Sequence, residues 1–370
     1  MTTTHPAVIQ RSSRHGLRYG LHDGSGSASG PAVVLVHGWC LNRQVWMYLE
    51  QALVAGGRTV ITPDLAGYGE SGGLAPRTSL ADHASDLTDL LDELDVERAV
   101  LVGFAFGAGV ICSAEDYRRV GALVSVAIPS AGTAPYDRMR GSILKDWPRF
   151  AARSAQAIVP AETSAETKDW LSRMFGATGL ASALAGLDIL RSFEPRDMVK
   201  RWDAPAYFVH GSGDPIVPAA ISKECAEQFG GEYLKVSSPA HLVVIDQKEA
   251  VHAIVEDVVA AVLPDELARI RAGSPRREPA PPRPPHPLPT PQAPRAEAVS
   301  QRHGCCILMG LPTTLPQPRC SSPTPTGVSG QWMMRMGSTG RSKPRSSALL
   351  ISRTTSAGLP PDLPRRSATE

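Results

Sequence analysis

Six short apolar segments constrain the fold of this chain more than any other feature of its sequence. Each is rich in Val, Leu, Ile or aromatic residues, as expected for strands buried on both faces of a sheet. They are residues 32–38, 59–64, 99–104, 122–128, 206–211 and 232–237. Because strands that alternate with helices form mostly parallel sheets, we predict an α/β fold built on a doubly wound, mostly parallel sheet.

Amphipathic stretches between these segments supply the predicted helices. Residues 79–95 place apolar positions at helical spacing, and Ser79 is suited to cap the start of that helix. The positions on its predicted inner face are Leu80, His83, Leu87, Leu90 and Leu91. Residues 248–270 predict a final helix, with a bend or break at Pro264 because proline lacks the backbone N–H that a helix interior needs.

One long interval departs from the alternation. From about residue 130 to 201 the sequence contains helical patterns and no strand pattern. An excursion of this length between two strands is too long for a plain loop. We therefore predict a helical cap over the carboxyl ends of the strands, where open α/β sheets bind their ligands.

The composition changes sharply near residue 272. More than half of the 33 prolines lie beyond that point, and residues 274–370 hold 13 Lys or Arg against 4 Asp or Glu. Such a segment has too little apolar surface to offset its ordering entropy. We predict a flexible N-terminus over 1–13, one domain over 14–271 and a disordered tail over 272–370. An extension without function, or an out-of-frame read, explains this tail better than a proline-rich ligand does.

The remaining sequence features narrow the classes of function. No apolar run reaches the ~18 residues of a membrane span, and no apolar segment of a secretory leader follows the N-terminus. Cys40, Cys112 and Cys225 lack paired or metal-like spacing. Residues 64–71 lack the Gly-Lys-Ser/Thr ending of a phosphate loop. We therefore expect a cytoplasmic protein with no metal, no cofactor, no membrane association and no nucleic-acid partner.

The segment at 101–110, LVGFAFGAGV, has the layout of a tight strand-to-helix turn that presents a nucleophile. In the pattern Gly-x-Ser-x-Gly the serine is replaced by Ala105, between Gly103 and Gly107. A methyl group cannot attack a carbonyl carbon. Cys112 and Ser113, two turns further along the predicted helix, are not expected to replace it, and neither is Cys40.

Five motifs, in order and with suitable spacing, resemble the α/β-hydrolase superfamily over residues 14–265. They are VLVHGWC, PDLAGYGES, LVGFAFGAG, FVHGSGDPIVP and SSPAHLVVIDQKEAV. The small esterases and cofactor-free perhydrolases are most similar, and their caps carry a turn like KDWPRF. The resemblance implies that Asp214 is the acid and His241 the base. It also implies an oxyanion hole made by the backbone N–H groups of Trp39 and Phe106. Ala240 departs from the glycine that usually precedes the histidine.

The cap sequence suggests an apolar roof over the site and hence a small-molecule substrate, an apolar ester. The candidate contact residues are Trp147, Phe150, Trp170 and Met174, with Phe175 beside them. A cap must also bury its own helices, so these side chains serve equally well as core.

Three hypotheses account for Ala105. The chain is a natural hydrolase relative that lost its serine, leaving a small-molecule binding protein or an inactive enzyme. Alternatively, Ala105 was introduced into an esterase to trap its substrate. Alternatively, His241 and Asp214 perform general-base chemistry without a nucleophile, as in the cofactor-free dioxygenases of this fold. Only one group of the triad is missing, which favours a carboxylic-ester hydrolase scaffold with its nucleophilic step disabled.

Overall fold

The computed structural model describes residues 9–24, 30–130, 133–198, 203–271 and 351–354. Within these ranges nine strands form one sheet in the order β1-β2-β4-β3-β5-β6-β7-β8-β9. The strands are β1 (Ile9–Ser12), β2 (Arg18–His22), β3 (Ala32–Val36), β4 (Val60–Pro63), β5 (Ala99–Phe104), β6 (Val120–Val126), β7 (Ala206–Gly211), β8 (Glu232–Val236) and β9 (Ile351–Thr354). β3 to β8 run parallel, whereas β1, β2 and β9 are antiparallel to their neighbours.

The six predicted strands are confirmed as β3 to β8. Every residue of β3, β4 and β5 is buried, as their uninterrupted apolar sequences predict. Burial of one Val or Leu side chain stabilises a fold by about 1.5–3 kcal/mol, so this central part of the sheet carries much of the core energy. The mostly parallel, doubly wound α/β fold predicted from sequence is therefore the fold of this chain.

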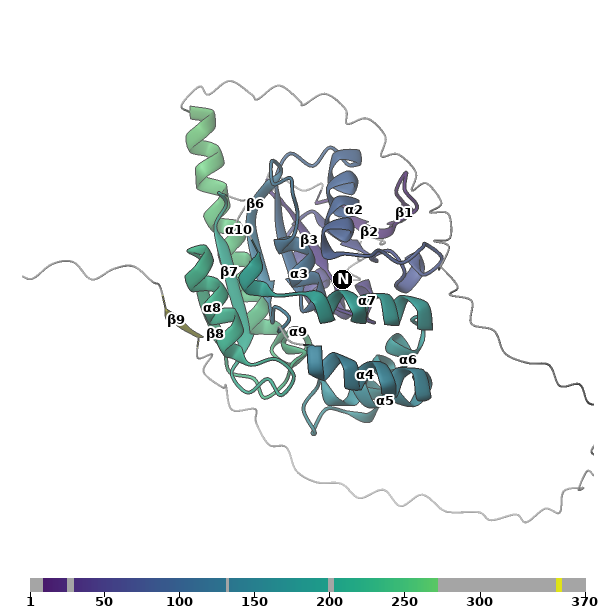
Figure 1. The fold of residues 1–370 in the computed structure, drawn as a ribbon. Coiled ribbons are helices and arrows are strands. Elements are labelled where there is room, and N and C mark those ends of the chain that lie inside the picture. Colours follow the sequence, from purple (N-terminus) through teal and green to yellow (C-terminus); the bar gives the residue numbers. More distant parts are fainter. Residues whose placement is uncertain (1–8, 25–29, 131–132, 199–202, 272–350, 355–370) are drawn as a thin grey trace, which may run out of the picture. The chain divides into compact units, whose positions relative to one another are not determined.

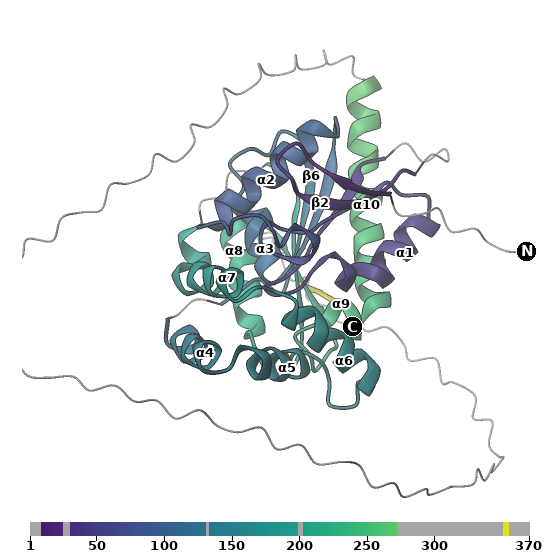
Figure 2. The same cartoon turned by 90° about the vertical axis from the view of Figure 1, so that its right-hand side faces the viewer.

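Helices cover both faces of the sheet. In Figure 2 the sheet is seen nearly edge-on, with α1 and α10 on one face and α2, α3 and α8 on the other. Their bounds are α1 (Met47–Ala55), α2 (Leu80–Glu93), α3 (Phe106–Cys112), α8 (Ala219–Phe229), α9 (Val243–Asp246) and α10 (Lys248–Arg271). Short 3-10 helices are η1 (Arg43–Trp46), η2 (Gly69–Ser71) and η3 (Pro195–Asp197).

The two helices predicted in most detail are α2 and α10. Ser79 caps α2, since its hydroxyl accepts a hydrogen bond from the N–H of Asp82 at 3.0 Å. All five residues expected on the inner face of α2 are buried. α10 runs through Pro264 as one helix, so the predicted break does not occur there.

Four helices lie between β6 and β7, where the cap was predicted. They are α4 (Thr133–Lys145), α5 (Trp147–Ala157), α6 (Ala165–Gly176) and α7 (Leu180–Ser192). Figure 1 shows them gathered together beside the sheet. Because they follow the carboxyl end of β6, they lie at the edge where the functional loops emerge.

The ends of the chain are described only in part. β1 and β2 precede the expected strands and extend the sheet past β4. Residues 351–354 of the predicted tail form β9, which pairs with β8. The remainder of the predicted tail and the first eight residues lie outside the described ranges. Within those ranges, no helix has the length and apolar character that a membrane crossing requires.

Candidate active site

The turn between β5 and α3 has the strained backbone of a nucleophile elbow. Ala105 sits between the two elements with φ 48° and ψ −112°, a conformation that side-chain-bearing residues rarely adopt. Its N–H donates to the carbonyl of Val126 at 2.8 Å, and its carbonyl accepts from Gly109 at 3.1 Å. The turn is therefore fixed on both sides although its side chain is a methyl group.

The glycines that flank Ala105 permit this tight turn. A Cβ on Gly107 would lie 2.6 Å from the carbonyl oxygen of His37, and a Cβ on Gly103 would lie 2.7 Å from the backbone nitrogen of Ala108. Real Cβ atoms do not approach backbone so closely, so only glycine fits at either position. The elbow consequently packs directly against the loop that follows β3.

The predicted acid and base are brought together. Asp214 follows β7 and His241 follows β8, and the His241 Nδ1 atom lies 2.7 Å from Asp214 Oδ2. The side chain of Asp214 is fully buried, whereas that of His241 is 8% exposed. The His241 ring centroid lies 5.1 Å from that of Phe104, the residue directly before Ala105. His241 therefore stands beside the elbow, with Nδ1–H directed to Asp214 and Nε2 left as the basic nitrogen.

Asp214 is held as a carboxylate by hydrogen bonds. The backbone N–H groups of Ile216 and Val217 donate to its Oδ1 at 2.8 and 3.0 Å. Burial acts to raise the pKa of Asp214. Hydrogen bonds from His210, His241 and Val217, together with attraction to His241, outweigh it and hold the pKa well below its usual range. This group therefore stays ionised throughout the neutral range.

The two predicted oxyanion donors come from two segments that pack against each other at the elbow. Phe106 is the first residue of α3, so its N–H has no partner within the helix. Trp39 follows Gly38 on the loop after β3. Within the described ranges neither backbone N–H makes a hydrogen bond. Both groups belong to the structural units from which such holes are built, one after the elbow residue and one on the loop after the first parallel strand.

Comparison with known proteins decides the family. A model described as "Alpha/beta hydrolase family" matches residues 33–254, more than half of the chain. The chain belongs to the α/β-hydrolase family.

Relatives and solved structures agree with this assignment. Non-heme chloroperoxidase CPO-A1 of Kitasatospora aureofaciens is 25% identical over 228 residues, covering 56% of this chain and 83% of that protein. An esterase from Exiguobacterium antarcticum has a TM-score of 0.61 at 19% identity, over 69% of this chain and 100% of its own. A bromoperoxidase from Bacillus anthracis also has a TM-score of 0.61, at 20% identity, over 68% of this chain and 100% of its own. At these identities the two structures support the α/β-hydrolase fold alone.

In this α/β hydrolase the Trp39 side chain joins the loop after β3 to the helices between β6 and β7. Its indole N–H donates to the carbonyl of Ala183 on α7 at 3.0 Å. Its ring meets the edges of Phe150 and Phe175, with centroids 6.4 and 6.3 Å away. A Cβ on Gly186 of α7 would meet the Trp39 indole and the Tyr68 hydroxyl. The loop after β3 is thus in close contact with α5, α6 and α7.

Of the four residues predicted to contact a substrate, two lie in or next to the contact with Trp39, and the other two pack in or against the core. Phe150 touches Trp39, and Trp147 stacks on Phe150 with centroids 6.1 Å apart. Met174 is buried in the core, and Trp170 is half-buried against it. Contact of these four side chains with a substrate stays a prediction.

Two buried histidines near the elbow were not singled out as site residues from sequence. His37 accepts from the N–H of Leu65 at its Nε2, 3.0 Å away, and its Nδ1 lies 2.9 Å from the carbonyl of Gly38, to which it donates. His83 packs edge-on against the ring of Phe106, with centroids 5.3 Å apart. Burial, with smaller contributions from His37 and a nearby arginine, lowers the pKa of His83 to about 3. His37 and His83 are therefore buried histidines beside the elbow, and burial lowers the pKa of both.

The alternative nucleophiles are unsuited to replace a serine. Cys40 and Cys112 are both buried. Burial raises the pKa of the Cys40 thiol well above its usual value and that of Cys112 to about 12. Because the thiolate is the nucleophilic form, neither group is activated at neutral pH. Within the described ranges no group of His, Cys, Asp or Glu side chains is arranged to hold a metal ion.

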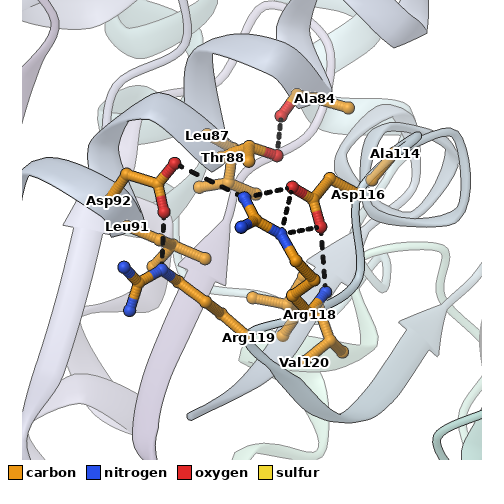
Figure 3. Close-up of a pocket in the computed structure, with 11 residues that line it drawn as sticks. Ala84, Leu87, Thr88, Leu91, Asp92, Ala114, Asp116, Arg118, Arg119 and Val120 are labelled. Atoms are coloured by element: carbon orange, nitrogen blue, oxygen red, sulfur yellow. Dashed lines mark hydrogen bonds and ion pairs between the residues drawn. The ribbon is translucent and has the colours of Figure 1, made fainter. Parts of the chain in front are cut away.

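A separate surface pocket lies away from this site, between α2 and the start of β6 (Figure 3). Arg118 pairs with Asp116 at 2.6 Å, and Arg119 pairs with Asp92 at 2.6 Å. The pocket adjoins Val120, the first residue of β6 and hence the opposite end of the strand from the elbow. Its arginines are already occupied by carboxylates, so it offers no ready anion site.

Proposed function

We propose that this protein is a carboxylic-ester hydrolase scaffold in which Ala105 disables acyl transfer. The observation that carries this proposal is the backbone of Ala105, which keeps the strained, positive-φ conformation of an elbow beside a hydrogen-bonded Asp214–His241 pair. An elbow of this kind serves to present a nucleophile to a base. The base and its acid partner are present, and the nucleophilic oxygen is absent.

A hydroxyl at position 105 would complete a familiar reaction. His241 Nε2 would take its proton as the oxygen attacks the ester carbonyl, while Asp214 stabilises the resulting imidazolium. The N–H groups of Trp39 and Phe106 would donate to the negatively charged oxygen of the tetrahedral intermediate. As the ester C–O bond breaks, the His241 imidazolium would give its proton to the departing alcohol, leaving an acyl group on the residue 105 oxygen. Neutral His241 would then take a proton from water, and the water would release the acyl group as the acid and restore the hydroxyl. With Ala105 the first bond cannot form, and loss of a serine nucleophile lowers turnover by about 10⁶-fold.

A small apolar ester suits the surroundings of the proposed site. Trp39, Phe150 and Phe175 form an aromatic cluster where the cap meets the oxyanion loop. Aromatic walls with a few placed polar groups are typical of sites that bind small apolar ligands. The protein from Exiguobacterium antarcticum, which shares this fold, is an esterase, and the proposal extends that chemistry to this chain.

The substitution Ala105→Ser tests the proposal. Hydrolysis of short-chain p-nitrophenyl esters should rise by about 10³-fold or more over the parent chain. The double variant Ala105→Ser/His241→Gln is the matched control, because it keeps the new hydroxyl and removes the base. A folded Ala105→Ser variant with no gain over the parent would overturn the proposal.

A second candidate function uses the base alone. The Asp214–His241 hydrogen bond of 2.7 Å is intact next to a methyl group, which favours proton abstraction that needs no nucleophile. In this case the parent chain would consume dioxygen with hydroxylated heteroaromatic substrates, His241→Ala would abolish the uptake, and Ala105→Ser would leave it unchanged. Saturable ligand binding without turnover in either version would instead indicate a binding protein.

A further inference from the structure

A second histidine contacts the acid of the proposed site. His210 lies on β7, four residues before Asp214, and its side chain is fully buried. Its Nε2 is 3.1 Å from Asp214 Oδ2 and 3.0 Å from the carbonyl oxygen of Val217. Its Nδ1 is 2.7 Å from the Oγ of Ser222 on α8. The same carboxylate oxygen therefore faces two imidazole rings, those of His210 and His241.

The partners of His210 determine which of its nitrogens carries the proton. Nε2 faces two acceptors, so it must be the N–H donor. Ser222 is fully buried, and within the described ranges Nδ1 is the one hydrogen-bond partner of its hydroxyl. Because a buried hydroxyl proton needs an acceptor, Nδ1 accepts from Ser222. His210 is accordingly neutral, protonated on Nε2, and donates to Asp214.

All the acceptor positions of Asp214 are thereby used. Oδ1 takes the backbone N–H groups of Ile216 and Val217, and Oδ2 takes the two imidazole N–H groups. An ionised carboxylate offers about four such positions. The two backbone donors already restrain Oδ1, whereas His241 alone would leave Oδ2 with a single donor. With His210 on the same oxygen, the carboxylate is fixed in line with His241 Nδ1.

We propose that His210, oriented by Ser222, is a positioning residue that holds Asp214 Oδ2 in place for His241. The proposal rests on the role of His241 as the base in the proposed function. It adds that the proton donated by His210 sets the orientation of the acid and, through it, the Nδ1–H tautomer of the base. His210 itself has no contact with the reacting atoms.

The first test is spectroscopic and requires no turnover. In ¹⁵N-histidine-labelled full-length protein, we expect His210 as the neutral Nε2–H tautomer and a downfield proton from His241 Nδ1–H. The resonances that disappear in the His241→Gln variant are those of His241. His210→Met keeps an apolar side chain without a donor, and should weaken or shift the His241 Nδ1–H resonance. His210→Gln can still donate and should restore it. Detection of His210 as the Nδ1–H tautomer, or an unchanged His241 resonance in His210→Met, would overturn the proposal.

The second test uses turnover in the Ala105→Ser background. His210→Met should lower kcat by about tenfold with little change in KM, because it misaligns the acid–base pair and leaves substrate binding intact. His210→Gln should recover most of the loss. His210→Met leaves the buried Ser222 hydroxyl without its acceptor, which could impair folding. The variant His210→Met/Ser222→Ala removes that hydroxyl as well and controls for this effect. If Ala105→Ser is inactive while the spectra behave as expected, the proposed function fails and the positioning role stands.

Discussion

Replacement of Ala105 by glycine should stabilise the folded protein. Its φ of 48° and ψ of −112° are a conformation that costs a residue with a side chain about 1–3 kcal/mol. Glycine adopts this conformation without strain, but its greater freedom in the unfolded chain cancels about 0.4–1 kcal/mol of the strain energy that is relieved. Loss of one half-buried methyl group removes roughly another 0.4 kcal/mol. The free energy of unfolding should therefore rise by about 1 kcal/mol.

Urea and thermal denaturation of matched variants measure this effect. A gain of about 1 kcal/mol corresponds to an increase in Tm of about 2–4 °C for a domain of this size. Ala127→Gly is the positive control, since Ala127 also has a positive φ, of 52°. Ala108→Gly is the negative control, because Ala108 lies within α3, where glycine costs about 1 kcal/mol. If Ala105→Gly destabilises the protein as Ala108→Gly does, the elbow is not strained and the reasoning fails.

Three further predictions concern groups around the elbow. The folded-state pKa of Asp214 is lowered, so the carboxylate stabilises the fold fully above pH ~4 and progressively less as the pH falls below that value. The difference in urea stability between the parent and Asp214→Asn should therefore shrink from pH 7 to pH 3. Gly107→Ala pushes a Cβ against the carbonyl of His37 and should cost about 1–3 kcal/mol or prevent folding, as circular dichroism and denaturation would show. Trp39→Phe leaves the carbonyl of Ala183 without its indole donor and should lower unfolding free energy by about 1 kcal/mol, measured calorimetrically.

The parallel strands were predictable because both of their faces are buried. A strand such as β5 has an unbroken apolar sequence. This pattern can be recognised without knowing which strands pair with it. β2 was missed for the opposite reason. It is an antiparallel strand of sequence RYGLH with an exposed first residue, and neither continuous apolarity nor strict alternation marks it. Its place in the sheet depends on pairing with β4, which only the tertiary structure reveals.

The site was predictable only where a motif carried it. Asp214 and His241 were located through their resemblance to a family pattern, and the 2.7 Å hydrogen bond between them agrees with it. His210 was missed, although a histidine within an otherwise apolar strand could have marked a buried polar group in need of partners. Those partners include Ser222, twelve residues away on α8, and no local spacing rule connects the two.

The contact between α7 and Trp39 restricts how this scaffold can be remodelled. Any side chain at Gly186 collides with the Trp39 indole, and a shift of α7 disturbs the hydrogen bond from that indole to Ala183. Changes to α7 therefore also affect Trp39, the residue predicted to supply one oxyanion donor. α5 and α6 reach the same indole through Phe150 and Phe175, so three helices are linked to Trp39, and a directed-evolution library built on this scaffold should hold Trp39 and Gly186 constant.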